Sequence, residues 1–275
     1  MMPLTLKCPA KLNLSLEVLG ERSDGMHDIK SRFQLIDLYD VMTIKKHAGS
    51  SNIITIKGYE DLNNENNIIN DALLLLSEYT KKAICCSVTV EKHIPVGGGL
   101  GGGSSNAATV LVAANKMYEL EISKAKLMEM GNELGADVPF FINGKNVIAS
   151  GTGNIFQTVE SSAKKYLLLF PGVNSSTQFM FSKWKDSRNT ILRSASSENH
   201  NSFLRIFLDK HQDIKEVFDL LELDMSLRMS GTGSTFFFEY EEGKEIEKTM
   251  KKIPTKWRHS FCEALQCSPL IQHLT

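Results

Sequence analysis

Polar and apolar residues alternate near the start of the chain. Leu12, Leu14 and Leu16 fall on one side of an extended segment. Lys11 falls on the other side, because successive side chains of a β-strand point to opposite faces. This period of two predicts a strand over residues 4–19 that has one apolar face and directs Lys11 away from it.

The rest of the first half combines short β-rich runs with helical patterns. Residues 47–51, His-Ala-Gly-Ser-Ser, indicate a hairpin between two short strands. Apolar residues spaced three and four apart indicate two successive helices, the first with Ser104 or Ser105 as its N-cap and the second with Ser123. The predicted segments are strands over 41–46, 53–58 and 87–91, a helix over 70–82, and helices that include 107–117 and 127–134.

From about residue 165 the order of the predicted elements changes. The segments are strands over 166–170, 226–229, 235–240 and 256–262, and helices over 202–221 and 242–252. Their order, βαββαβ, is that of the split-βαβ sandwich. The polar residues 182–201 are expected to form a variable excursion outside this pattern. We therefore predict an α+β protein with domains over 1–158 and 159–275 and a site in the cleft between them.

Composition and charge exclude several classes of protein. The 275 residues are 42% hydrophobic, which excludes a disordered chain. A net charge of −1 provides no basic field for nucleic acid or an anionic membrane. Without an apolar signal sequence or membrane-length run, we expect a cytoplasmic protein. The 5 cysteines lack CxxC spacing, which argues against a disulfide scaffold and a zinc site.

A glycine-rich loop precedes the first of the two successive helices. Residues 97–103 contain six glycines, interrupted only by Leu100. Glycine reaches positive φ and lets a ligand approach the main chain closely. A helix N-terminus beyond such a loop presents unpaired N–H groups and the positive end of the helix dipole. This arrangement predicts an anion site, and phosphate is the expected anion.

Other interpretations of the loop fit less well. Gly97, Gly99 and Gly102 satisfy GxGxxG, but a second helix follows where a dinucleotide-binding fold has a second strand. The Gly-Lys-Ser/Thr of a Walker loop is missing, as are the HRD and DFG signatures of protein kinases. A flexible linker would not normally lead at once into a capped helix with an apolar face.

The loop sequence PVGGGLGGGSSNAA closely resembles the second motif of the GHMP kinase superfamily. The other two superfamily motifs are matched by PAKLNL at residues 9–14 and SGTGSTFF at residues 230–237. LGADVPFF at residues 134–141 is similar to the members that phosphorylate a cytidine diphosphate-linked methylerythritol. The resemblance implies an ATP-binding N-terminal domain like ribosomal protein S5 and a ferredoxin-like C-terminal domain, with the active site between them.

The resemblance also implies roles for individual residues. Lys11 and Asp137 match the catalytic residues: Asp137 would orient or deprotonate the accepting hydroxyl, and Lys11 would stabilise charge there. The residues expected at ATP are Asn67, Ile68, Lys92, Pro95, Val96, Gly97, Gly98, Gly99, Leu100, Gly101, Gly102, Gly103, Ser104, Ser105 and Asn106. Those expected at the second substrate are Asn13, Met26, His27, Asp137, Phe181, Gly231 and Thr232. Mg²⁺ is expected with ATP, with its protein ligands unassigned.

The activity implied by the resemblance is ATP-dependent phosphorylation of the substrate's 2-hydroxyl, in the non-mevalonate route to isoprenoid precursors. A kinase of another small alcohol, such as homoserine or mevalonate, is the alternative within the superfamily. A nucleotide-binding regulator without chemistry is the alternative from another class, and the presence of Lys11 and Asp137 argues against it. We expect a monomer or a weak homodimer that binds ATP and one small-molecule substrate.

One position departs from the family pattern. The turn that usually reads Asp-Gly-Tyr-His reads Asp24, Gly25, Met26 and His27 in this chain. The resemblance places His27 against cytosine, with the missing tyrosine stacked on the base opposite a phenylalanine that Phe181 matches. Methionine is polarizable and packs against aromatic faces, so the base pocket is expected to survive the substitution.

Overall fold

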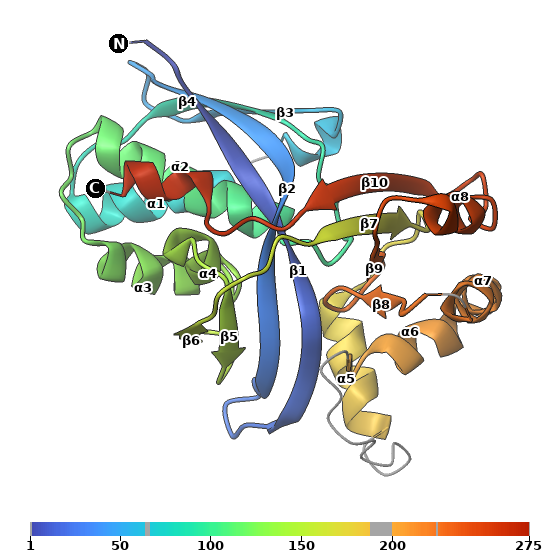
Figure 1. The fold of residues 1–275 in the computed structure, drawn as a ribbon. Coiled ribbons are helices and arrows are strands. Elements are labelled where there is room, and N and C mark those ends of the chain that lie inside the picture. Colours follow the sequence, from blue (N-terminus) through green and yellow to red (C-terminus); the bar gives the residue numbers. More distant parts are fainter. Residues whose placement is uncertain (1, 64–66, 188–199, 224, 275) are drawn as a thin grey trace.

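The computed structural model describes residues 2–63, 67–187, 200–223 and 225–274 of the chain. Two β-sheets form its centre. The first sheet includes a long hairpin of two strands, which passes through the middle of the molecule (Figure 1). The helices of residues 68–143 gather on one side of this hairpin, and the strands of residues 165–263 lie on the other (Figure 1). The α+β class is therefore confirmed.

The first sheet belongs to the N-terminal half and contains six strands. They are β1 (Leu4–Glu21), β2 (His27–Lys46), β3 (Ile53–Lys57), β4 (Cys86–Glu91), β5 (Val147–Ser150) and β6 (Ile155–Thr158). The order is β3-β4-β2-β5-β6, with β1 paired antiparallel to β2. The predicted hairpin across residues 47–51 is wrong, because β4 pairs with β2 and β3 lies parallel to β4 on its far side.

Helices cover this sheet and close the first hydrophobic core. They are α1 (Ile68–Thr80), α2 (Gly102–Met117), α3 (Lys124–Leu134) and α4 (Val138–Asn143). Ser123 caps α3 as predicted, accepting a hydrogen bond from the backbone N–H of Lys126. Neither Ser104 nor Ser105 caps α2, because the helix begins earlier and its N-cap is Gly101 at φ 71°. A left-handed residue at the cap is possible here because glycine has no Cβ.

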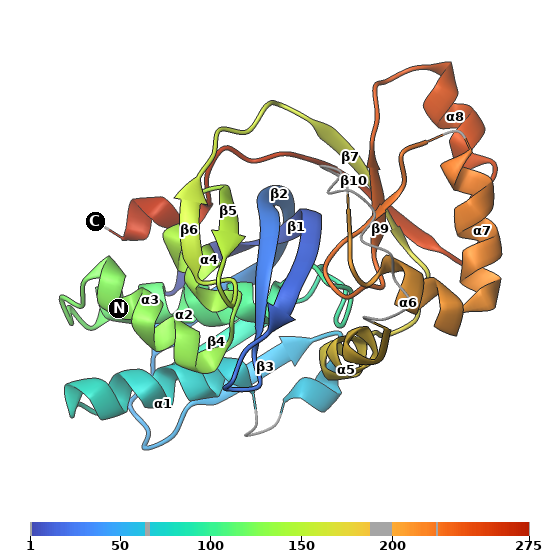
Figure 2. The same cartoon turned by 90° about the horizontal axis from the view of Figure 1, so that it is seen from below.

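The second sheet forms the C-terminal half. Its strands are β7 (Lys165–Phe170), β8 (Arg228–Met229), β9 (Phe236–Glu239) and β10 (Arg258–Glu263). The order β10-β7-β9-β8, antiparallel throughout, is that of a split-βαβ sandwich. The helices α7 and α8 lie on its outer side and the β1–β2 hairpin on its inner side (Figure 2).

The helices of the C-terminal half are α5 (Thr177–Ser187), α6 (Leu204–Lys210), α7 (Gln212–Glu222) and α8 (Lys244–Met250). The single helix predicted over 202–221 is two helices separated at His211. The start of the predicted excursion, 182–187, is the end of α5, and residues 188–199 lie outside the described residues. Asn201 pairs with Leu16 of β1, so the predicted excursion ends before residue 201. Both limits of the prediction over 182–201 are therefore wrong.

Strand β1 passes through all three hydrophobic clusters. Cys8 is packed in the core of the N-terminal half. Leu12 and Leu14 pack against the inner face of the second sheet, and Leu16 belongs to the C-terminal core. Lys11 points away from these leucines, as the alternation predicts, but it is buried as well.

The segment after β10 returns to the N-terminal half. A 3₁₀ helix at Pro269–His273 packs against β1, α2 and α4. Asn146 donates to the carbonyl of Leu265 at 2.7 Å, and the N–H of Ser268 donates to the carbonyl of Gly144 at 2.8 Å. The limits 1–158 and 159–275 therefore stay a prediction, and the first unit is completed by residues from the second.

Candidate active site

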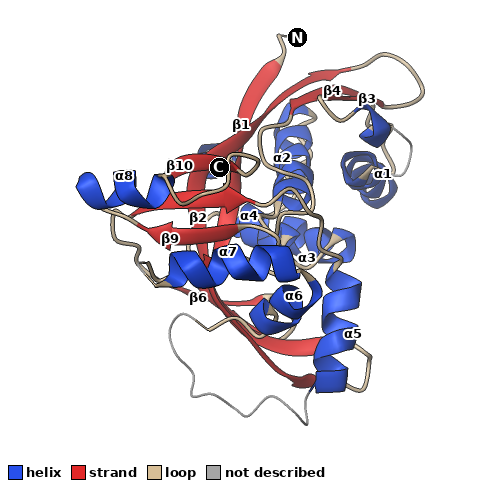
Figure 3. Cartoon of the chain, turned by 90° about the vertical axis from the view of Figure 1, so that its right-hand side faces the viewer, coloured by secondary structure: helices blue, strands red, loops and turns tan. Residues whose placement is uncertain are grey.

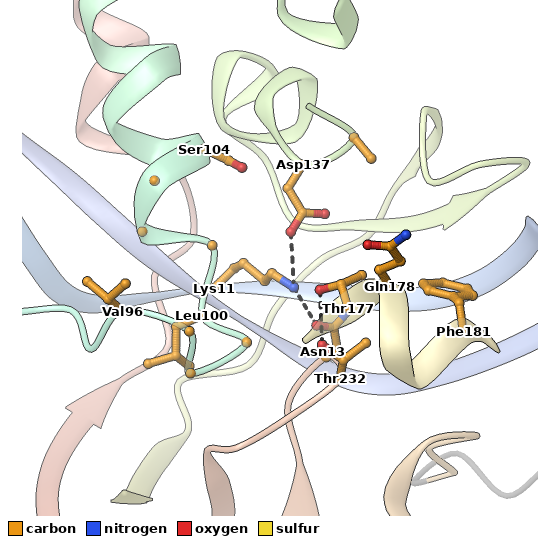
Figure 4. A pocket seen from close by; sticks show the side chains of 18 of the residues that line it. Lys11, Asn13, Val96, Leu100, Ser104, Asp137, Thr177, Gln178, Phe181 and Thr232 are labelled. Carbon is orange, nitrogen blue, oxygen red and sulfur yellow. Dashed lines mark hydrogen bonds and ion pairs between the residues drawn. The ribbon is translucent and has the colours of Figure 1, made fainter. Parts of the chain in front are cut away.

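A cleft of about 1220 Å³ opens between the two halves. Its walls come from β1, the glycine loop, the starts of α1 and α4, one face of α5 and the turn between β8 and β9. Figure 4 shows Lys11, Asp137, Thr177 and Thr232 directed toward one space, with Phe181 farther along α5. These segments are distant in sequence and are brought together by the fold.

Lys11 lies at the centre of the cleft, beside the carboxylate of Asp137. Its Nζ atom is 3.3 Å from Asp137 Oδ2, and only 4% of the lysine side chain is exposed, against 31% of the aspartate. Lys11 also donates a hydrogen bond of 2.5 Å to Asn13 Oδ1. Asn13 in turn donates to Ser31 Oγ at 2.8 Å. The ammonium group is therefore fixed toward the cleft on a strand buried on both faces.

The backbone around Asp137 leaves its carboxylate free for the cleft. Gly135 ends α3, and Asp137 holds the N-cap position of α4. Its side chain makes no capping hydrogen bond to α4 within the described chain. A carboxylate at a helix N-terminus is stabilised by the dipole, and Lys11 adds a full positive charge. The short α4 thus presents Asp137 and does not use it as a cap.

The glycine loop forms the wall beside Lys11. Gly97, Gly99 and Gly101 have φ values of 71°, 75° and 71°, a region that other residues rarely adopt. A Cβ on Gly99 would lie 2.3 Å from the carbonyl oxygen of Ser230, so the loop and the β8–β9 turn are in backbone contact. The carbonyl of Leu100 accepts the N–H of Lys11 at 3.0 Å. The loop is therefore fixed against both β1 and the second sheet.

The residues predicted at ATP line the cleft with one exception. Asn67 caps α1 by accepting the N–H of Ile69 at 2.9 Å, and it faces the cleft together with Ile68. Ser104 also lines the cleft. Ser105 does not, because it is fully buried and its N–H donates to the carbonyl of Gly101 at 2.9 Å. Of the two serines, only Ser104 can offer its hydroxyl to a ligand there.

The far end of the cleft is an aromatic pocket between the β1–β2 hairpin and α5. The ring centroids of His27 and Phe181 are 4.7 Å apart, and Trp184 lies edge-on to the histidine at 5.6 Å. Among the described residues, the buried Nε2 atom of His27 has no hydrogen-bond partner. Met26 lines the same end of the cleft and is 49% exposed. Figure 3 shows α5 alongside the hairpin tip.

The β8–β9 turn contributes Gly231 and Thr232 to the cleft. The Oγ1 atoms of Thr232 and Thr177 are 3.3 Å apart, and Ser175 donates to the carbonyl of Thr232 at 2.6 Å. This turn is thereby linked to the first turn of α5. The sequence motif SGTGSTFF predicts the turn but gives no sign of its partner.

Sequence reasoning missed several residues of the site. Thr177 and Gln178 line the cleft from α5, in a segment for which no helix was predicted. Asp40 is fully buried beneath the glycine loop, and Lys92 forms an ion pair with it. Burial also raises the pKa of the neighbouring Cys8 thiol to about 12. No local pattern marks Asp40, because every group that it contacts is remote in sequence.

Two oxygen donors of the cleft suit a magnesium ion. Mg²⁺ prefers carboxylate, hydroxyl and phosphate oxygens and usually retains several waters. Ser104 and Asp137 both line the cleft, so each can offer an oxygen atom to it. In the described part of the chain, no group of three or more His, Cys, Asp or Glu side chains could hold a metal by itself. A nucleotide-bound ion therefore fits, and a site made by the protein alone is not found among these residues.

Comparisons of the sequence match this chain to known kinases. The model for the GHMP kinases N terminal domain matches residues 67–145. The chain is 36% identical over 273 residues to the 4-diphosphocytidyl-2-C-methyl-D-erythritol kinase of Acinetobacter baylyi, with 97% of both proteins covered. It is 35% identical over 275 residues to the Haemophilus ducreyi protein of that name, with 98% of both covered.

Solved structures have a similar fold. A crystal structure of 4-(cytidine 5'-diphospho)-2C-methyl-D-erythritol kinase has a TM-score of 0.76 and 26% identity, and the match covers 95% of this chain and 99% of the other. Methanococcus jannaschii mevalonate kinase, at 15% identity and a TM-score of 0.64, shares the fold over 96% and 98% of the two chains. No helix among the described residues is long and apolar enough to cross a membrane.

Proposed function

The chain belongs to the 4-diphosphocytidyl-2-C-methyl-D-erythritol kinase family, and from this premise we propose that Lys11 and Asp137 carry out its phosphoryl transfer. The protein phosphorylates the 2-hydroxyl of 4-diphosphocytidyl-2-C-methyl-D-erythritol with ATP, a step of the methylerythritol phosphate route to isoprenoids. The observation that carries the residue assignment is the 3.3 Å ion pair of Lys11 and Asp137 beside the glycine loop.

ATP binds along the glycine loop, with its phosphates at the start of α2. N–H groups at a helix N-terminus and the dipole favour an anion there. The adenine end extends toward Asn67 and Ile68 at the start of α1, on the same wall of the cleft. Lys92 and Asn106 flank the loop and complete this wall. The Ser104 hydroxyl contacts a phosphate oxygen or the Mg²⁺ that accompanies ATP.

Asp137 and Lys11 act on the accepting hydroxyl. Asp137 accepts its proton or hydrogen bond, which directs an oxygen lone pair toward the terminal phosphorus in line with the leaving group. Lys11 stabilises the negative charge that develops on this oxygen and on the moving phosphoryl group. Asn13 keeps the lysine in position through the 2.5 Å hydrogen bond. Bound Mg²⁺ supplies charge neutralisation between the phosphates.

The cytidine end of the substrate lies against the pocket formed by Met26, His27 and Phe181. His27 Nε2 is buried without a partner among the described residues, which suits a hydrogen bond to the base. Phe181 provides an aromatic face that already packs against the histidine. The turn at Gly231 and Thr232 closes the cleft beside the reacting alcohol. Since one chain supplies all these groups, we propose that a monomer is active. The cytoplasmic location expected from the sequence stays a prediction.

The test is turnover with a panel of alcohols. The protein is incubated with ATP, Mg²⁺ and one alcohol at a time, and ADP release is followed. We expect turnover with 4-diphosphocytidyl-2-C-methyl-D-erythritol and none above background with mevalonate or homoserine. Phosphorylation of either of those instead would contradict the substrate assignment. ATP binding without turnover of any alcohol would favour a regulator.

A further inference from the structure

A single buried carboxylate holds both ends of the glycine loop. Asp40 lies on β2 and is fully buried. Its Oδ1 atom accepts the backbone N–H groups of His93 at 2.8 Å and Ile94 at 2.9 Å. Its Oδ2 atom accepts Lys92 Nζ, and also Asn106 Nδ2 at 3.1 Å. All four donors therefore converge on one side chain.

These donors come from opposite sides of the loop in sequence. Lys92, His93 and Ile94 directly precede it, and Asn106 follows it in α2. The segment 95–105, which contains all six glycines, is thus closed at its base by Asp40. Lys92 and Asn106 line the cleft, whereas Asp40 does not. Any effect of Asp40 on a ligand must therefore be transmitted by the groups that it holds, of which Lys92 and Asn106 face the cleft.

We infer that Asp40 is a positioning residue of the ATP site, acting through Lys92 and Asn106; this inference rests on the proposed function of the glycine loop. Glycine-rich backbone loses more conformational freedom than any other when it is fixed. A carboxylate that fixes both ends before the nucleotide arrives reduces the ordering that ATP binding must supply. It also directs the Lys92 ammonium to the first turn of α2, where a Cβ on Gly102 would lie 3.2 Å from Nζ.

The contact pattern identifies the variant that separates charge from shape. In Asp40→Asn, the amide oxygen can still accept the N–H groups of His93 and Ile94. Its NH₂ group then faces the Lys92 ammonium and the Asn106 amide, both of which are donors. Turning the amide over moves the conflict to the two backbone N–H groups. One end of the loop is therefore released in either orientation.

The first experiment measures each substrate separately. For Asp40→Asn we expect the KM for ATP to rise at least about tenfold, while the KM for the alcohol changes less than about twofold. Calorimetry with a non-hydrolysable ATP analogue should show the same loss of affinity without any dependence on turnover. Circular dichroism establishes that the variant is folded. A merely structural role would lower the active fraction and leave both KM values unchanged.

The matched control is Asp37→Asn on the same strand. Asp37 accepts the N–H of Glu263 at 2.6 Å, and no hydrogen bond or ion pair found within the described residues joins it to the glycine loop. Both KM values should stay at those of the unmodified protein. If the two variants behave alike, the effect belongs to β2 in general, and the inference is overturned.

A second variant restores the carboxylate from the other side. In Asp40→Asn with Asn106→Asp, the new carboxylate can accept Lys92 Nζ, which lies 3.2 Å from Asn106 Oδ1. The asparagine at position 40 can then donate to it and still accept from the backbone. We expect the logarithm of the KM for ATP in this double variant to return at least about halfway from its value in Asp40→Asn to that of the unmodified protein.

The outcomes separate the inference from the proposed function. An unmodified protein that does not turn over ATP with its alcohol contradicts the proposed function. An active unmodified protein whose folded Asp40→Asn variant keeps its KM for ATP contradicts only the inference. A folded double variant no better than the single variant also overturns it. If Asp40→Asn does not fold, the double variant alone decides, since it must then fold and bind the ATP analogue.

Discussion

The two ends of the cleft are made from different parts of the chain. The end that we propose for ATP, called the ATP end below, is mainly main chain: three glycines at positive φ, a helix start and a loop whose base is held by Asp40. The end that we propose for cytidine, called the cytidine end below, is made of side chains from two halves of the protein, with His27 on β2 and Phe181 on α5.

This difference predicts which positions of the site tolerate substitution and which do not. Backbone N–H groups bind phosphate whatever side chains surround them, but they require a loop geometry that few residues allow. Side chains at the proposed cytidine end can be exchanged one at a time, and we expect Met26 to be such an exchange. We therefore expect substitutions at the ATP end to weaken nucleotide binding strongly and those at the cytidine end to adjust selectivity.

The largest effect is expected where the two ends meet, at Asp137. Asp137→Asn keeps the shape of the side chain and removes its ability to accept a proton. We expect kcat to fall at least about 100-fold, the scale for a positioned base, with ATP affinity nearly unchanged. Steady-state kinetics and calorimetry check both quantities. Asp219→Asn, which breaks a surface ion pair on α7, is the control; near-normal turnover of Asp137→Asn would remove this residue from the mechanism.

At the ATP end, Gly99→Ala should weaken nucleotide binding most. The new Cβ would lie 2.3 Å from the carbonyl oxygen of Ser230, at a φ of 75°. Backbone on one side must move, so we expect ATP affinity to fall at least about 30-fold, with strain of roughly 1–3 kcal/mol in stability. Calorimetry and thermal melting are the measurements. Gly20→Ala meets open space and should change neither quantity; unchanged ATP affinity in Gly99→Ala would show that the loop adapts.

At the cytidine end, His27→Ala should relax selectivity without preventing the reaction. The variant loses a hydrogen-bonding group that is buried and has no partner among the described residues. Lost hydrogen bonds discriminate between substrates more sharply than lost stacking. We expect the preference for the cytidine-linked over the uridine-linked alcohol, as the ratio of kcat/KM, to fall by about tenfold or more. His259→Ala on β10 is the control; an unchanged preference would place the base elsewhere.

The smallest effect is expected at Met26, which is 49% exposed. A sulfur–aromatic contact contributes roughly 0.3–1.5 kcal/mol, comparable to an aromatic pair. Met26→Tyr should therefore change the KM for the alcohol by less than about tenfold. Leu19→Ala, an exposed apolar change on β1, is the control. A larger change in KM for Met26→Tyr would mean that the two ends of the cleft are equally sensitive to substitution.

The sequence indicated the proposed ATP end by one continuous motif and the proposed cytidine end only by separate residues, and the comparison explains why. Main-chain sites need particular residues in consecutive positions, so the loop of residues 95–106 was recognisable as a motif. The first turn of α5 was missed because it belongs to no motif and reaches the cleft only through folding. Asp40 was missed for the same reason, since Asn106 lies 66 residues away along the chain.

The errors in the fold have similar causes. Residues 47–51 have the composition of a hairpin turn, but β4 pairs with β2 over six residue pairs and displaces β3. The local sequence holds no information about a strand later in the chain that pairs more favourably. Ser104 is a good cap by residue type, yet the αL geometry of Gly101 lets the helix begin earlier. The order of the strands after residue 165 was correct, because each has its own apolar pattern.

The return of residues 264–274 to the first half affects how the protein folds during synthesis. Leu265 donates its N–H to the carbonyl of Leu35, and Leu265 and Leu274 pack on the N-terminal core. The ribosome synthesises residues 1–158 before residues 264–274. The nascent N-terminal half therefore has apolar surface uncovered beside β1, α2 and α4, a surface open to chaperones until the later residues cover it.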